Sequence, residues 1–407
     1  MKQTVVALLA PYRTFLRLPD IPAMIATAWL SRMPVAMNGL ALLLFMREIL
    51  GNFKVAGSIV GTFFVAMAIA APILGRLIDR IGPRTPLVVT GILHPLAMIG
   101  LFLATTHGAS VPVLVAAAGI CGIFAPPVTI LTRTTWRHRF TDDHNRKMAY
   151  SIDSIMIEIN FTVGPLVVAS IVAASNARVA LATVISISVC AVLIFFASPI
   201  LKYWKREPPA ERHLLGPLTD FRLVALLGLT FGLTFCFGLL EVGYPAYATS
   251  LQWVAFGGIL LALNATGSAV GGFIYGALHL SMSLERQFTI SLAIMSVPLF
   301  LHGVVDQHAL FAMVAFLAGV CIAPALTAQT LLITQIAPMK YATEAFTWSS
   351  TFIVTGIGVG MATGGAIAES YYIKAPFLLA GSAIALMALL SLTMKPSQRR
   401  CQRTGNT

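Results

Sequence analysis

The feature that most constrains this chain is a series of apolar runs, each about twenty residues long, separated by short polar segments. A helix needs about 20 apolar residues to cross a bilayer, because the hydrocarbon core is roughly 30 Å thick and each residue rises 1.5 Å. Charged residues make up only 10% of the 407 residues, against roughly 25% in ordinary soluble domains. The pattern predicts an all-α protein that crosses a membrane many times.

Hydropathy divides the chain into twelve predicted spans in two sets of six. The first set covers residues 22–46, 55–78, 86–106, 110–132, 150–174 and 178–201. The second set covers residues 222–245, 253–278, 288–305, 309–335, 343–367 and 375–394. We therefore expect two six-helix bundles, at 1–201 and 221–394, joined by a polar cytoplasmic linker at 202–220 and followed by a cytoplasmic tail at 395–407.

Lysine and arginine are distributed unevenly between the two predicted sides of the membrane. With a cytoplasmic N-terminus, 22 of the 27 fall on the cytoplasmic side and only four on the other: Arg47, Lys54, Arg178 and Lys374. An excess of positive charge in cytoplasmic loops sets the orientation of membrane proteins. The distribution of Lys and Arg therefore predicts cytoplasmic termini in a cell inner (plasma) membrane. It also accounts for the net charge of +12, which gives no support to nucleic-acid binding.

The first ten residues resemble a weak signal peptide, but Pro11 and Arg13 interrupt the apolar stretch, so we expect a lead-in that is not cleaved. The five cysteines show neither a disulfide framework nor zinc-ligand spacing. Nucleotide-binding P-loop, H-E-x-x-H and G-x-S-x-G patterns do not occur. We therefore expect no enzyme activity, metal or cofactor. The expected partners are a small-molecule solute, protons and the lipid bilayer, and the protein is expected to be a monomer.

The two sets of spans resemble each other. The segment Ala118–Pro126 in span 4 recurs as Ala318–Pro324 in span 10, and I-L-G-R-L at the end of span 2 recurs as I-Y-G-A-L at the end of span 8. Gly39-Leu40 in span 1 likewise matches Gly238-Leu239 in span 7. Three nearly equal offsets of about 200 residues indicate a parallel duplication, with substrate handled between the halves near the midplane.

A charged stretch, L-G-R-L-I-D-R-I-G-P-R, follows span 2 directly. It resembles the pattern G-x-L-x-D-R-x-G-x-R that major facilitator superfamily transporters carry between spans 2 and 3. Here the pattern is supplied by Gly75, Leu77, Asp79, Arg80, Gly82 and Arg84, with Leu87 three residues on. The resemblance extends over the whole chain in length, span count, linker and repeat, and it points to the bacterial 12-span type similar to drug and sugar efflux permeases.

The resemblance implies two pseudo-symmetric six-helix bundles and transport by alternating access. It also implies that Asp79 meets the start of span 11, at residues 341–346, and latches one access state. From the residues themselves, we expect Gly75 to let helices approach closely and Gly82 to form the tight turn. Leu280 and Ser281 replace the Asp-Arg pair in the second half, so one latch is expected; a mere topology anchor is the alternative.

Charged residues inside predicted spans are functional candidates, because each costs about 2.5 to 3.5 kcal/mol at a helix centre on insertion scales. Arg32 in span 1 and Glu158 in span 5 lie at similar depths, so we predict that they pair, either to exchange a proton or as a static ion pair. Asp153 lies about 140° around the helix from Glu158. Asp153 and Glu344 are expected to be structural, because the N-terminus of a helix stabilises a nearby acid. Arg32, Asp153 and Glu158 are the proton-coupling candidates.

Several other side chains are candidates for the substrate cavity. The resemblance places Glu241 of span 7 in the cavity, and we expect it toward the periplasmic mouth; an interfacial contact is the alternative. Asn38, Gln329 and Trp348 add hydrogen-bonding or stacking capacity, as do Asn160 and Asn264, although each also suits a helix contact. His94 is alone in span 3 and is expected to be structural.

Span 5 carries Gly164-Pro165, which predicts a helix kink because proline removes a backbone hydrogen bond. Antiporters of the superfamily often carry G-P-x-x-G-G here, and the two later glycines are missing. Span 4 also lacks the arginine of many drug antiporters, since Arg133 lies at its cytoplasmic end. The favoured hypothesis is nevertheless proton-coupled efflux of a small organic molecule. The alternatives are an importer or facilitator, a membrane receptor without transport, or an unrecognised membrane enzyme.

Overall fold

The computed structural model describes residues 14–140, 142–204, 217–278, 280–337 and 342–394. All regular structure in these residues is helical. The first half contains α2 (Ile21–Leu50), α3 (Phe53–Ile81), α4 (Arg84–Thr106), α5 (Val111–Ile123), α6 (Val128–Arg139), α7 (Asp143–Ala174), α8 (Ala177–Ala197) and the short helix η1 (Pro199–Lys202). The second contains η2 (Pro217–Thr219), α9 (Phe221–Ser250), α10 (Val254–Ala277), α11 (Leu284–Val304), α12 (His308–Val320), α13 (Ile322–Ile336), α14 (Ala342–Ser370) and α15 (Ala375–Ser391).

Twelve helical segments match the twelve predicted spans in order. Eleven of the described segments are long and apolar enough to cross a membrane, with α5 and α6 counted as one span and α12 and α13 as another. The twelfth, α15, is an apolar helix of 17 residues. The predicted fold class is therefore confirmed. The predicted linker lies largely outside the described residues, which resume at Pro217.

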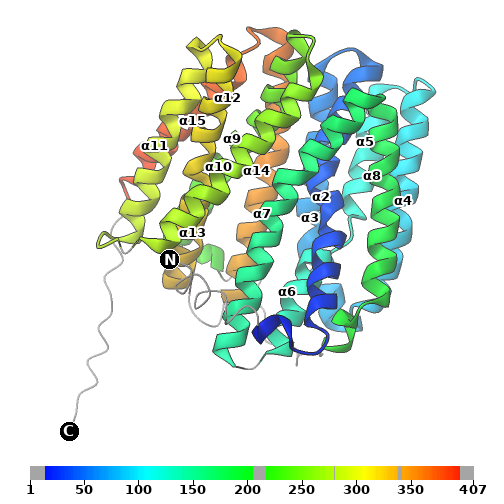
Figure 1. The fold of residues 1–407 in the computed structure, drawn as a ribbon, viewed down its shortest axis with the longest axis vertical. Coiled ribbons are helices and arrows are strands. Elements are labelled where there is room, and N and C mark those ends of the chain that lie inside the picture. Colours follow the sequence, from blue (N-terminus) through cyan, green and yellow to red (C-terminus); the bar gives the residue numbers. More distant parts are fainter. Residues whose placement is uncertain (1–13, 141, 205–216, 279, 338–341, 395–407) are drawn as a thin grey trace.

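The helices run alternately between two ends of the molecule (Figure 1). We call the end that carries the α3–α4 and α6–α7 connections and both edges of the linker the linker end. The opposite end, which carries the α2–α3, α7–α8 and α9–α10 connections, is called the far end. Helix α2 begins and helix α15 ends at the linker end.

The two halves meet most closely between α3 and α14 at the far end. A Cβ added to Gly57 would lie 3.1 Å from Gly365 Cα, and one added to Gly61 would lie 2.9 Å from Ala362 Cβ. The N–H of Phe53, at the start of α3, also donates to Glu369 Oε2 over 2.8 Å. Small residues allow helix backbones to approach in this way, which matters in lipid because the hydrophobic effect does not drive helices together there.

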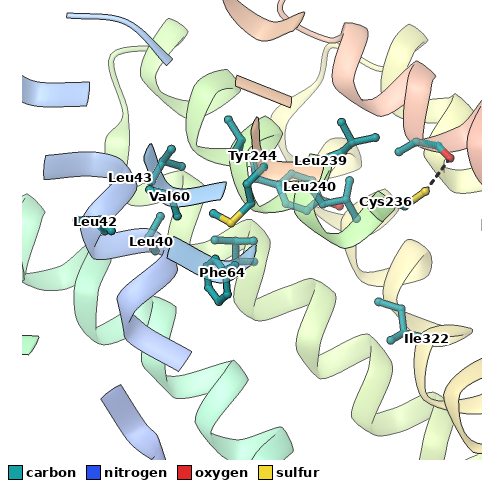
Figure 2. Close-up of a cluster of buried hydrophobic side chains, with 14 of the residues drawn as sticks. Leu40, Leu42, Leu43, Val60, Phe64, Cys236, Leu239, Leu240, Tyr244 and Ile322 are labelled. Carbon is teal, nitrogen blue, oxygen red and sulfur yellow. Dashed lines mark hydrogen bonds between the residues drawn. The ribbon is translucent and has the colours of Figure 1, made fainter. Parts of the chain in front are cut away.

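A second contact between the halves joins α7 to α10, also toward the far end. A Cβ on Gly258 of α10 would lie 3.0 Å from the carbonyl oxygen of Pro165. Apolar side chains from both halves pack around these contacts, including Leu40 and Phe64 from the first half and Leu239 and Tyr244 from the second (Figure 2). The far-end part of the molecule is therefore one continuous core across both halves.

Spans 4 and 10 are each interrupted within the repeated segment found in the sequence. Span 4 breaks between α5 and α6 at residues 124–127, and span 10 breaks at Cys321. The break in span 4 follows from Pro126 and Pro127, which lack the N–H that a continuous helix needs. His94 repairs part of the loss, because its Nδ1 lies 2.9 Å from the carbonyl oxygen of Cys121. This contact agrees with the structural role expected for His94.

The packing at Gly61 yields a prediction about stability. Gly61→Val would place side-chain atoms against Ala362 and the α14 backbone, and overpacking of this kind costs about 1 to 3 kcal/mol. We expect a lower melting temperature for the purified protein in detergent. Gly100→Val is the matched control, because a Cβ at Gly100 meets no atom within 4 Å. Equal melting temperatures for the two variants would contradict the proposed packing constraint.

Candidate functional site

The charged stretch after span 2 forms a very short connection at the linker end. Helix α3 ends at Ile81 and α4 begins at Arg84, and Gly82 between them has a φ of 89°. That left-handed backbone conformation favours glycine, so the predicted tight turn is confirmed. Arg80 and Arg84 are exposed, whereas Asp79 is half-buried.

The expectation for Gly75 is wrong in this conformation. A Cβ added there would meet no heavy atom within 4 Å, so no neighbouring helix packs closely against it. The equivalent residue in the second half, Gly276, also has open space beside it. The predicted partner of Asp79 lies partly outside the described residues, at Tyr341 and the side chains of Ala342 and Thr343, although Glu344 is described and lies in the first turn of α14. The latch therefore stays a prediction.

A buried ion cluster joins α2, α6 and α7. Arg32 Nη1 donates to Asp153 Oδ1 over 2.6 Å, and the two side chains are 4% and 2% exposed. Trp136 Nε1 donates to the same oxygen over 3.3 Å, and Arg133 Nε lies 3.6 Å from Asp153 Oδ2. The predicted pairing of Arg32 with Glu158 is therefore wrong, because Asp153 is the partner.

The correction follows from the faces of α7. Asp153, Asn160 and Gly164 all contact α2, through Arg32, the Trp29 carbonyl oxygen and Ala36 respectively. Their spacings of seven and four residues place them on one helix face. Glu158 lies about 140° from Asp153 and seven residues before Pro165, which contacts α10. Arg32 and Glu158 lie at similar depths in the membrane, but their side chains are on helix faces that do not face each other.

Glu158 thus lies on the side of α7 that faces α10 in the other half. Its side chain is half-buried, and its carboxylate makes no hydrogen bond or ion pair with a described residue. The contact of α7 with α10 at Pro165 lies about 10 Å closer to the far end, at 1.5 Å per residue. Glu158 is therefore a carboxylate without a partner among the described residues, on the side of α7 that faces the other half and on the linker-end side of the contact at Pro165.

Glu241 is the second carboxylate between the halves. A Cβ added to Gly39 would lie 3.9 Å from Glu241 Oε2 and 3.5 Å from the Phe64 ring. Glu241 therefore extends from α9 toward α2 and α3, and its carboxylate also makes no hydrogen bond or ion pair with a described residue. It lies nine residues before the end of α9, about 14 Å at 1.5 Å per residue, so it is well inside the membrane.

Asn38 lies beside this region but faces a cavity within the first half. The cavity, about 40 Å³, is also lined by Ser31, Phe63, His94, Pro126 and Ser188. Asn38 is 5% exposed, and its Oδ1 makes no hydrogen bond with a described residue. Because one water needs about 10 to 15 Å³ of such volume, the cavity suits a few waters and is too small for an organic solute.

Three of the other polar candidates make helix contacts. Gln329 Nε2 donates to Ser349 Oγ over 2.9 Å and so joins α13 to α14. Asn264 Nδ2 donates to the Ala315 carbonyl oxygen over 3.0 Å, and Asn160 Nδ2 donates to that of Trp29 over 3.1 Å. Trp348 is half-buried and packs edge-on against Phe352. The three amide contacts match the alternative that the sequence left open for Gln329, Asn264 and Asn160.

The Gly164-Pro165 pair is a packing site on both sides of α7. Helix α7 is assigned without a break through Pro165. A Cβ on Gly164 would lie 3.2 Å from Ala36 Cβ, and the Pro165 carbonyl oxygen lies against Gly258. The pair therefore lets α7 approach α2 in its own half and α10 in the other half.

Sequence reasoning missed Arg133, Trp136 and Trp29 as members of the site. Arg133 and Trp136 are three residues apart and share a face of α6, which directs both toward Asp153. The sequence signal for these residues was the proline pair before α6. Prolines there end α5, so α6 can run in a different direction from α5. Among the described residues, no three His, Cys, Asp or Glu side chains gather as a metal site.

Solved transporter structures share this architecture. The nucleoside transporter NupG superposes with a TM-score of 0.73 at 12% identity, covering 93% of this chain and 100% of that one. The POT family transporter PepTSo gives 0.72 at 12% identity, covering 92% and 97%. At such low identity the likeness shows the fold alone.

Sequence comparison identifies the family. The uncharacterized MFS-type transporter y4rN of Sinorhizobium fredii (strain NBRC 101917 / NGR234) is 24% identical over 278 residues, which cover 66% of this chain and 68% of the relative. The family model of the Major Facilitator Superfamily matches residues 24–301 and 254–406. Members of this family are transporters rather than enzymes. The chain therefore belongs to the Major Facilitator Superfamily and is a multi-pass membrane transporter.

Proposed function

We propose that this transporter exports a small organic solute in exchange for protons, by alternating access of a site between its two halves. The observation that carries the proposal is the carboxylate of Glu158, which has no partner among the described residues and lies on the α10-facing side of α7, on the linker-end side of the contact between the halves. A carboxyl group without a cationic partner in a low-dielectric site can accept a proton at modest cost, whereas one in an ion pair holds its charge.

The ion pair of Arg32 with Asp153 has a different role in this proposal. Asp153 receives hydrogen bonds from Arg32 and Trp136, so its negative charge is well stabilised. Glu158 and Glu241 are then the proton carriers, and the Arg32 cluster holds α2, α6 and α7 together and faces the solute. Of the earlier proton-coupling candidates, Glu158 is retained and Asp153 is assigned to support.

The proposed orientation places loading of the solute on the cytoplasmic side. We propose that the linker end faces the cytoplasm of the cell inner membrane, because the excess of Lys and Arg lies there. The close contacts of α3 with α14 and of α7 with α10 then close the site toward the outside. A conformation closed to the outside is the one in which an exporter loads its solute, and an importer releases its solute from the same conformation.

Protons supply the driving force in this scheme. One charge moving across 100 mV releases about 2.3 kcal/mol, which corresponds to a roughly fifty-fold concentration ratio. An importer using the same residues remains the second candidate, and it predicts the opposite dependence on the direction of the gradient. A receptor without transport predicts no solute-dependent proton flux.

The role of Glu158 can be tested in everted membrane vesicles. The solute is first identified by comparing metabolites retained by cells with and without the protein. Adding it to vesicles with an acidic lumen should release protons through the wild type, and Glu158→Gln should abolish this flux because the amide cannot carry a proton. Glu48→Gln is the control, since Glu48 lies at the far end and accepts the Ala177 N–H. Wild-type flux through Glu158→Gln would refute the coupling role.

The latch predicted at Asp79 has its own test. A charge at a helix terminus contributes up to about 2 kcal/mol, so Asp79→Asn should slow transport by up to roughly 30-fold while membrane insertion is unchanged. Transport is measured as solute efflux from cells, and insertion as the amount of protein in the membrane fraction. Efflux equal to that of Glu48→Gln would reduce the charged stretch to a topology anchor.

A further inference from the structure

The seam between α2 and α7 contains buried polar atoms that lack hydrogen-bond partners among the described residues. They are Trp29 Nε1, Arg32 Nε, Arg32 Nη2 and Asn160 Oδ1. Buried polar groups in proteins are nearly always hydrogen-bonded, so several exceptions in one seam require an explanation. Trp29 and Arg32 lie three residues apart on one face of α2, and Asn160 contacts the Trp29 carbonyl oxygen across the seam. The exceptions therefore form one group.

Three of these four atoms are hydrogen-bond donors. Arg32 uses Nη1 for Asp153, and its Nε and Nη2 remain on the other edge of the guanidinium. That edge presents two parallel N–H groups, the geometry that the two oxygens of a carboxylate match. The Arg32 side chain is only 4% exposed, so this edge is shielded from water in the present conformation.

The charges around this edge favour an anion. Asp153 pairs with Arg32, which is 4% exposed, and with Arg133, which is 55% exposed, so these three side chains together carry one net positive charge. Glu158 faces a different side of α7 and pairs with neither arginine among the described contacts. A bound monoanion would balance the charge of these three side chains.

We propose that the Nε–Nη2 edge of Arg32 binds a carboxylate group of the transported solute, which makes organic anions the substrate class. This inference rests on the proposed transport function and names its substrate. Trp29, one turn of helix away, contributes its indole N–H on the same face. Asp153, which accepts the indole N–H of Trp136, holds the guanidinium in place through Nη1.

The depth of Arg32 favours a solute over a lipid headgroup. Arg32 lies eleven residues after Ile21, the first residue of α2, which corresponds to about 16 Å at 1.5 Å per residue. That distance is close to half the thickness of the hydrocarbon core, whereas lipid phosphates lie outside the core. An anionic solute also fits export, because an anion leaving a cell with a negative interior moves down the electrical gradient.

The experiment measures thermal stabilisation of the purified full chain in phosphatidylcholine nanodiscs at fixed ionic strength. The probes are three carboxylates, each paired with its neutral amide: acetate with acetamide, benzoate with benzamide, and succinate with succinamide. Ligands that bind the folded state raise the melting temperature. We expect at least one carboxylate to stabilise the wild type more than its amide does. If none does, the proposal is overturned.

Two variants connect that preference to Arg32. Arg32→Lys keeps the charge but loses the two-pronged edge, so we expect the dissociation constant for the carboxylate to rise by about tenfold. Arg178→Lys is the matched control, because Arg178 is exposed at the far end beside Glu48, and it should bind as the wild type does. Equal weakening in both variants would contradict the assignment.

A double variant covers the case in which a single change prevents folding. Arg32→Gln alone would leave Asp153 with a weaker partner, and breaking a buried ion pair is strongly destabilising. Arg32→Gln combined with Asp153→Asn removes both charges and leaves the net charge unchanged. It should fold and lose the preference for carboxylate over amide, and a surviving preference would overturn the proposal.

Two further arms separate the alternatives. Replacing phosphatidylcholine with phosphatidylglycerol should leave the carboxylate shift unchanged, whereas its loss would assign the Arg32 edge to lipid headgroups and overturn the solute assignment. Proton flux in everted vesicles tests transport separately. Solute-coupled proton flux without a preference for carboxylates would overturn the assignment of organic anions as substrates and leave the proposed proton coupling. A carboxylate preference without proton flux would remove the proposed proton coupling and leave the substrate class.

Discussion

The close approach of α3 and α14 at the far end is the contact on which the rest of the structure depends. Gly57 and Gly61 of α3 lie so close to the α14 backbone that a Cβ at either position would require movement of a neighbour. In lipid, tight packing of small residues replaces the hydrophobic effect as the source of helix association. The two halves are thereby fixed at one end, and any large relative movement must either occur at the other end or break this contact.

Helix α14 packs against helices of both halves. Helix α14 presents glycines to two partners at once: Gly358 and Gly365 face α3 in the first half, and Gly356 and Gly360 face α9 in its own half. In the chain order, α14 belongs to the second half. Its packing against both α3 and α9 makes it part of the interior of both halves. A change in the position of α14 would therefore alter the contact between the halves and the interior of the second half together.

The sequence predicted the helices well because length and hydropathy determine them. The third predicted span, 86–106, corresponds to Arg84–Thr106, and Gly82 adopts the turn conformation expected for it. The pairing of Arg32 failed because depth describes position along the membrane normal and says nothing about which side of a helix a residue occupies. The spacing of Asp153, Asn160 and Gly164 places them on one side of α7. That side can be assigned to Arg32 only when α2 is known to be the neighbouring helix.

The interruption of span 4 has a mechanical consequence. A continuous helix acts as one stiff rod, whereas α5 and α6 are two short rods joined by residues 124–127. The first rod is held against α3, because Gly122 packs on the Phe63 and Met67 backbone, and the second carries Trp136 to Asp153. Tilting of α6 can therefore change the surroundings of Arg32 while α5 keeps its contact with α3. Residues 124–127 thus allow the charged cluster to move independently of the closed far end.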